Sequence, residues 1–179
     1  TVKVTGIADW FVNYDLTLKA MGVTRADQLR TTSYISQNQD GKKNRHVIVE
    51  FSPSEVVVSV TPKYGDWGFP PTSKVQMLEA VDPLSAIMEL TLRAEATMAN
   101  PCGGPMRVFD GKQRYDLRLK FVQRLNWKSK AYTGPALKCD LEYIEIAGFK
   151  NKTAEEKAKD KRDMKWSNII LAELNGGAL

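Results

Sequence analysis

The sequence contains little histidine and little cysteine, and it has no long apolar segment. Its 179 residues include one histidine, His46, and two cysteines, Cys102 and Cys139. A single histidine excludes multi-histidine metal sites and most catalytic triads with a histidine base. No stretch approaches the ~20 apolar residues of a membrane span. GxGxxG and GKS/GKT motifs are also absent, so no phosphate-binding glycine loop is predicted and no cofactor is expected.

The two cysteines lie outside any CxxC motif, which argues against zinc and redox-motif sites. Two cysteines permit one disulfide, and a disulfide would imply an oxidising compartment. Two buried thiols in a cytosolic protein fit the same count. The count alone therefore leaves both alternatives open.

Basic residues exceed acidic ones by 26 to 21, which gives a net charge of +5. Residues 150–165 hold seven basic and four acidic side chains in an interleaved run. Such a run is typical of a solvated helix face or a mobile loop. The alternative is a patch that docks a partner or an anionic surface through Lys157, Lys159, Lys161 and Arg162. No basic stripe lies on a recognisable nucleic-acid module, so nucleic acid is not an expected partner.

Length and alternation predict one mainly β domain spanning residues 1–179. Apolar and polar residues alternate with a period of two, which is typical of antiparallel sheets with one wet face. Asp110-Gly111 supplies the backbone conformation of a tight hairpin turn, and a second hairpin is expected around Pro53. The predicted strands cover residues 10–20, 43–51, 55–61, 106–109, 112–125 and 136–147.

One helix is predicted, over residues 83–99 approximately. Asp82 is a favourable N-cap, and Pro83 suits the first helical position because its missing N–H costs nothing there. Pro101 and the following glycine pair should stop the helix, so that Cys102 would lie just past its end. The apolar stripe expected to face the sheet consists of Leu84, Ile87, Met88 and Leu92.

A loop rich in proline and glycine is predicted over residues 62–76, and it carries Tyr64, Trp67 and Phe69. Three aromatic side chains on one loop could line the mouth of a ligand site. Packing over the edge of a sheet or barrel is the favoured interpretation.

No residue is assigned a catalytic role. His46 alternates onto the polar side of its strand, and Ser85 lacks the GxSxG context of an exposed nucleophile. Asp116, Asp140 and Glu142 are the candidates for a glycosidase-like pair of carboxylates. They alternate outward beside arginine and lysine, which favours surface ion pairs.

Three segments together carry a resemblance. DPLSAIMEL at 82–90, CGGPMRVFDGKQRYDLRLKF at 102–121 and YTGPALKCDLEYIEIAGF at 132–149 resemble the bacterial domain of unknown function 3108 family, whose members look like exported envelope proteins of Gram-negative bacteria. The resemblance implies a periplasmic location with the signal peptide removed, a Cys102–Cys139 disulfide, and a curved antiparallel sheet, open β-barrel or spiral around the helix. It supplies no catalytic residue. It also leads us to expect further strands before Thr1 and after Trp166.

The predicted function is that of a non-enzymatic periplasmic scaffold or carrier. It would bind a lipid, a lipoprotein or another envelope partner in an apolar hollow between the sheet and the helix. A fully packed core without a ligand fits the sequence equally well. The alternative function is an envelope hydrolase that acts on cell-wall glycan through paired carboxylates. Residues expected to face an apolar ligand are Ile87, Met88, Leu92, Tyr115, Leu117, Leu119 and Tyr143.

Overall fold

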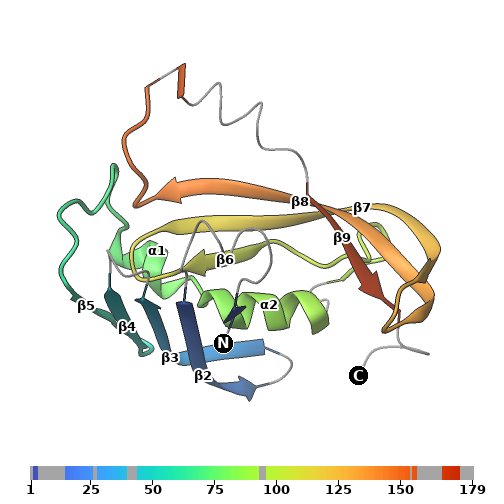
Figure 1. Cartoon of the computed structure of the whole chain (residues 1–179), viewed down its shortest axis with the longest axis horizontal. Coiled ribbons are helices and arrows are strands. Elements are labelled where there is room, and N and C mark those ends of the chain that lie inside the picture. The colour runs from blue at the N-terminus through green and yellow to red at the C-terminus, as the bar shows by residue number, and fades with distance from the viewer. Residues whose placement is uncertain are drawn as a thin grey trace.

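The computed structural model confirms a mainly β protein in which antiparallel strands surround one central helix. It describes residues 2–3, 15–25, 28–39, 44–92, 96–153, 155–156 and 167–173. The described strands form two sheets, and helix α2, Pro83–Leu92, lies between them and contacts both (Figure 1). The predicted strand at 10–20 is observed from Asp15 onward, and its first five residues lie outside the described part of the chain.

The first sheet is a five-stranded meander in the order β1-β2-β3-β4-β5. Ser52 closes the predicted β4–β5 hairpin, because its N–H and its hydroxyl both donate to the Glu55 carbonyl at 2.8 Å. Val47 and Val49 on β4 are buried, as the alternation predicted. The strands are β1 Val2–Lys3, β2 Asp15–Arg25, β3 Gln28–Gln39, β4 Arg45–Phe51 and β5 Val56–Thr61.

The second sheet has four strands in the order β6-β7-β8-β9. Its long β7–β8 pair spans most of the length of the molecule (Figure 1). The β6–β7 turn forms at Asp110-Gly111 as predicted, with Gly111 at φ 98°. The Asp110 carboxylate fixes this turn by accepting from the backbone N–H groups of Lys112 and Gln113 at 2.9 and 2.7 Å. The strands are β6 Met106–Phe109, β7 Arg114–Lys128, β8 Thr133–Ala147 and β9 Ser167–Ala172.

The predicted start of α2 is confirmed, whereas its predicted end is wrong. Asp82 caps the helix by accepting from the backbone N–H groups of Leu84 and Ser85 at 2.9 and 3.2 Å. The helix ends at Leu92, and residues 96–100 are irregular. The Asn100 side chain holds this segment, since its amide donates to the carbonyls of Gly103 and Leu119. Thr97 and Asn100 also form a local turn, in which the Asn100 N–H donates to the Thr97 hydroxyl at 3.0 Å.

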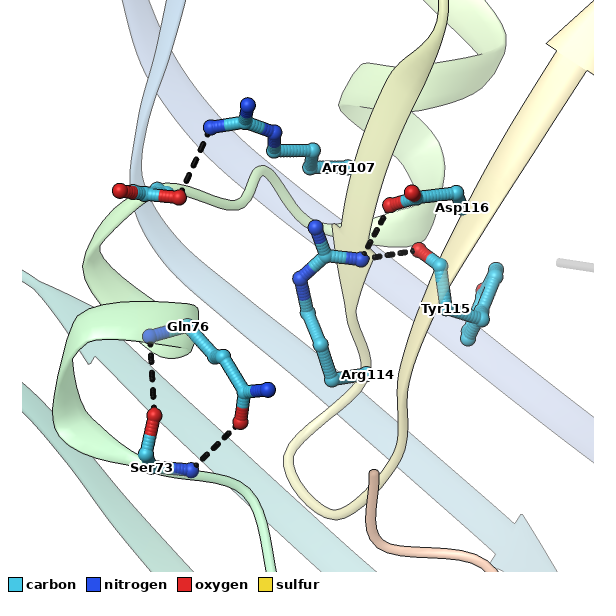
Figure 2. A network of polar contacts seen from close by, with 7 residues as sticks. Ser73, Gln76, Arg107, Arg114, Tyr115 and Asp116 are labelled. Atoms are coloured by element: carbon cyan, nitrogen blue, oxygen red, sulfur yellow. Dashed lines mark hydrogen bonds and ion pairs between the residues drawn. The ribbon is translucent and has the colours of Figure 1, made fainter. Parts of the chain in front are cut away.

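The apolar stripe predicted on α2 is only partly correct. Leu84 packs on the five-stranded side, but Ile87 and Met88 are both 54 % exposed. The buried Ala86 and the partly buried Leu90 pack against the four-stranded sheet. A helix held between two sheets buries two opposite sides, so a single stripe does not describe it. The short helix α1, Lys74–Leu78, was not predicted, and Ser73 and Gln76 form a capping box at its start (Figure 2).

The expected disulfide is present between Cys102 and Cys139, whose Cα atoms lie 6.2 Å apart. Both residues are completely buried in an apolar cluster beneath the four-stranded sheet. Because α2 ends ten residues earlier, the bond ties the connection before β6, rather than the helix end, to strand β8.

Three glycines allow close contacts where the loop after β5, the end of β8 and the β6–β7 turn meet. Gly68 and Gly148 have positive φ and touch backbone to backbone, and a Cβ on Gly148 would come within 2.0 Å of the Lys112 carbonyl oxygen. The Phe69 N–H donates to the Phe149 carbonyl, and the Gly148 N–H donates to that of Pro70. Gly111 rests on Val47, where a Cβ would lie 2.5 Å from a methyl group. The β6–β7 turn therefore inserts against the inner face of the five-stranded sheet.

Candidate ligand-binding site

A polar cavity of about 310 Å³ lies between the inner face of the five-stranded sheet and the β6–β7 turn. Strands β2, β3 and β4 form one wall, and the loop after β5, the first residue of α2 and strand β7 complete it. The volume falls at the lower end of the range usual for small-molecule sites. The lining residues are Leu16, Leu18, Tyr34, Ser36, Asn38, Arg45, Val47, Tyr64, Pro83, Asp110 and Tyr115.

Strand register explains why polar side chains reach this cavity. Asn38 on β3 pairs directly with Arg45 on β4, and Ser36 pairs with Val47. Directly paired residues point to the same face of a sheet, and Val47 is buried on the inner face. Asn38, Arg45 and Ser36 therefore share the face that carries the valines, so the inner face of this sheet is only partly apolar.

Two buried polar atoms in the cavity wall lack a partner. Neither Nε of Arg45 nor Oδ1 of Asn38 makes a hydrogen bond within the described part of the chain. The Arg45 guanidinium lies over the Tyr64 ring, with its central carbon 4.5 Å from the ring centroid, and the Lys112 ammonium lies 5.3 Å from the same centroid. Cation–π contacts hold the arginine in place but leave its Nε–H unused.

Asp110 is surrounded by tyrosines. Burial raises the pKa of its carboxyl, while its two hydrogen bonds from backbone N–H groups act in the opposite direction. Burial also raises the pKa of Tyr34, Tyr64 and Tyr115, and the nearby charge of Asp110 raises each of them further. The cavity thus contains hydroxyl groups that stay protonated and an acid that holds its proton more tightly than a free aspartic acid does.

A second, mainly apolar cavity of about 340 Å³ lies on the other side of the β6–β7 turn. Phe109 and Lys112 line this cavity, whereas Asp110, between them in sequence, lines the polar one. The turn therefore separates the apolar cavity from the polar cavity. The other lining residues are Val56, Val58, Trp67, Pro71, Thr72 and Met77.

Two of the three loop aromatics reach these cavities. Tyr64 lines the polar cavity and Trp67 lines the apolar one, and their rings meet edge to face at 5.0 Å. Phe69 is 69 % exposed and lines neither cavity. The loop thus contributes one aromatic ring to each cavity.

Of the seven residues expected to face a ligand, Tyr115 lines the polar cavity, and Tyr143 stacks on it with ring centroids 4.7 Å apart. Leu117 and Leu119 belong to the apolar cluster around the disulfide. Ile87 and Met88 lie on the exposed side of α2, and the side chain of Leu92 lies outside the described part of the chain.

The three candidate carboxylates face cations and line neither cavity. Asp116 accepts from the buried guanidinium of Arg114 at 2.6 Å (Figure 2). Asp140 pairs in register with a lysine, and Glu142 pairs with an arginine. The Asp116 ion pair is largely buried rather than the surface pair expected, and strand register alone places Asp140 and Glu142 opposite cations. Among the described residues, no group of three or more His, Cys, Asp and Glu side chains is arranged to hold a metal ion.

His46 is exposed, and Ser85 is part of a buried polar contact. The hydroxyls of Thr31 and Ser85 both donate to one oxygen of the fully buried Asp82 carboxylate, at 2.6 and 2.5 Å. This contact ties the start of α2 to strand β3. The cations proposed for a docking patch, Lys157, Lys159, Lys161 and Arg162, lie outside the described residues.

Sequence reasoning missed Asn38, Arg45, Tyr34 and Asp110 as site residues. One signal was available: Arg45 shares the alternation phase of Val47, which places a charge on a predicted apolar face. Asn38 carried no such signal, because strand β3 was not predicted.

The fold and the site together define a disulfide-stabilised β protein with a central helix and a cavity under one sheet. No helix in the described part of the chain is long and apolar enough to cross a membrane. The model of a family described as "Protein of unknown function (DUF3108)" matches residues 1–167, so the chain belongs to this family. No curated protein and no solved structure matches the chain.

Proposed function

We propose that the protein is a non-enzymatic binding protein of the bacterial envelope, and that it holds a small ligand between the five-stranded sheet and the β6–β7 turn. The observation that carries this proposal is the pair of cavities on the two sides of that turn. Each cavity is large enough for part of a small molecule. Within the loop after β5, Tyr64 lines the polar cavity and Trp67 lines the apolar cavity.

A location outside the cytosol is part of the proposal. Disulfides persist in oxidising compartments and are rare in the cytosol. The Cys102–Cys139 bond is completely buried within the core, so it belongs to the folded structure rather than to an exposed redox site. The periplasm of a Gram-negative cell is the compartment that fits this chemistry, with the signal peptide removed after export.

The ligand should be amphipathic rather than wholly apolar. The apolar cavity offers Val56, Val58 and Trp67 to an alkyl or aromatic group, whereas the polar one offers Arg45 and Asn38. A lipid with a compact head group, or a lipid-modified partner, meets both requirements. A hydrolase finds less support, because Asp140 and Glu142 lie opposite cations in the β7–β8 register and Asp116 pairs with Arg114.

Native mass spectrometry of the protein, exported to the periplasm and purified without detergent, tests the proposal. We expect an additional bound mass, which Leu18→Trp or Val58→Trp should remove by filling the polar or the apolar cavity. Lys19→Trp and Val57→Trp are matched controls, because these neighbours are exposed on the opposite face of the same strands. Absence of any bound species, both after purification and after incubation with a periplasmic extract, would overturn the proposal.

A further inference from the structure

The apolar cavity contains one charged side chain. Among the described residues that line this cavity, Lys112 carries the one charge, and all the others except Thr72 are apolar. The Thr72 hydroxyl is already used, because it donates to the Lys112 carbonyl at 2.8 Å. The Lys112 side chain is partly exposed, so its ammonium is within reach of a ligand that enters the cavity.

The Lys112 ammonium lies at the Tyr64 end of the apolar cavity. It is 5.3 Å from the centroid of the Tyr64 ring, and that ring meets Trp67 edge to face at 5.0 Å. Trp67 lines the apolar cavity, whereas Tyr64 lines the polar one. The guanidinium of Arg45 approaches the same ring, with its central carbon 4.5 Å from the centroid. Two positive charges therefore lie beside the aromatic contact at which the two cavities adjoin.

Neither of these two cations forms an ion pair within the part of the chain that the structure describes. The buried guanidinium of Arg114, in contrast, has the Asp116 carboxylate at 2.6 Å. The acid closest to Lys112 in sequence, Asp110, lines the polar cavity, and its carboxylate accepts from two backbone N–H groups. The apolar cavity therefore has a positive charge at one end and no carboxylate among its described lining residues.

A ligand that fills the apolar cavity displaces water from the side of the Lys112 ammonium that faces it. Loss of hydration around a charge is unfavourable unless a new partner replaces the water. A neutral ligand supplies no such partner, and a cationic ligand adds repulsion from both cations. An anionic group restores charge-assisted hydrogen bonds to the ammonium. The cavity thus selects an apolar chain that ends in a negative charge.

We propose that the apolar cavity takes the chain of an anionic amphiphile, whose carboxylate or phosphate pairs with the Lys112 ammonium beside Tyr64. This inference rests on the proposed function and names the charge and the chemical class of its ligand. A lysine binds such a group as a point charge, so a fatty acid and a lipid phosphate share the same recognition. The volume of about 340 Å³ suits one short chain.

Isothermal titration calorimetry of the whole chain with octanoate, octanol and octylamine tests the inference, because these probes share one chain and differ in charge. We expect octanoate to bind about tenfold more tightly than octanol, which corresponds to one charge-assisted hydrogen bond at a partly exposed site. Octylamine should bind least tightly. Lys112→Met should abolish the preference for octanoate and leave the binding of octanol unchanged. Lys63→Met is the matched control, because it removes the same charge from an exposed residue that adjoins Tyr64 and lines neither cavity.

Lys112→Glu repeats the test if Lys112→Met does not fold, and it should reverse the order, so that octylamine binds more tightly than octanoate. Octyl phosphate compared with octanoate assigns the head group, since the tighter probe identifies its class. Equal binding of octanoate and octanol by the wild-type chain, or a preference for octanoate that survives Lys112→Met, would overturn the inference. If Val58→Trp still removes a bound species from the purified protein in that case, the cavity holds a ligand without selecting its charge, and the proposed function stands.

Discussion

The two sheets of the protein differ in what they enclose. Beneath the four-stranded sheet, Leu119, Leu137 and the two cysteines form a dry cluster with almost no exposed surface. Beneath the five-stranded sheet, buried valines share the inner face with Asn38 and Arg45 and border a cavity. One half is thus packed for stability, and the other keeps room and unused hydrogen-bonding groups.

Under the proposed function, stability and binding would depend on different parts of one fold. The β6–β7 hairpin connects them, because its strands belong to the four-stranded sheet and its turn packs Gly111 on Val47 of the other. Strand β6 is also bridged to the segment before α2, where Val81 pairs with Val108. Changes in the packed half should therefore cost stability at every pH, whereas changes in the cavity should alter binding or the way in which stability depends on pH.

Removal of the disulfide should have the largest effect. The double variant Cys102→Ala/Cys139→Ala opens a link with a sequence separation of 37 residues, and the chain-entropy model puts the loss at about 4 kcal/mol. Urea unfolding of the two proteins measures the difference in the free energy of unfolding. Ligand binding under folding conditions should be retained. A loss below about 1 kcal/mol would remove the contrast between the two halves.

Gly148→Ala should come second, because it strains the junction between the halves. Gly148 has φ 81°, and the added Cβ would meet the Lys112 carbonyl oxygen at 2.0 Å. Backbone strain and overpacking together should cost about 3 kcal/mol in the free energy of unfolding. Gly65→Ala is the matched control, since a Cβ there meets nothing within 4 Å. Equal unfolding midpoints for the two variants would show that the backbone around Gly148 accommodates the added methyl group, and would contradict the prediction.

Asp110→Asn should have the smallest effect, and that effect should depend on pH. The pKa of Asp110 is raised in the fold from 3.8, mainly by burial, so the folded protein holds its proton more tightly than the unfolded chain. Its contribution to stability is therefore lost as pH rises from about 4 through the raised pKa. The asparagine variant keeps the Oδ1 acceptor for the backbone N–H groups of Lys112 and Gln113 but never ionises.

The expected result is an advantage of Asp110→Asn over wild type that appears as pH rises through this window and persists above it. Urea unfolding of both proteins between about pH 3 and pH 8 measures this advantage. Asp66→Asn is the control, because exposed Asp66 makes a comparable turn by accepting from the Gly68 N–H. A difference between wild type and Asp110→Asn that stays constant with pH would contradict the burial of this acid.

The sequence predicted the strands that have one solvent-exposed face and one buried face. Strands β7 and β8 were predicted because their alternation is regular, and strands β4 and β5 because they are rich in β-branched residues. The Asp110-Gly111 turn was predicted because it needs a positive φ. Strand β3 escaped because its inner face carries Tyr34, Ser36 and Asn38, and a register shift that skips Thr32 breaks its period. The same polarity that builds the cavity therefore hides the strand that lines it.

Two further features depend on contacts between distant segments. Residues 96–100 were predicted as helix but are irregular, and the bond from Asn100 to the Leu119 carbonyl on β7 joins segments that local helix propensity does not relate. The pairing of Asn38 with Arg45 requires the register of β3 and β4, which alternation alone does not define. The disulfide was expected only through the family resemblance, because counting cysteines left it open.

The buried contact among Thr31, Asp82 and Ser85 has a consequence for the energetics of binding. It fastens the first turn of α2, where Pro83 borders the polar cavity, to the same strand that presents Asn38. Two walls of the cavity are thereby held at a fixed spacing before a ligand binds. A ligand would not have to order these two walls, so little of its interaction energy would be lost to conformational entropy on binding.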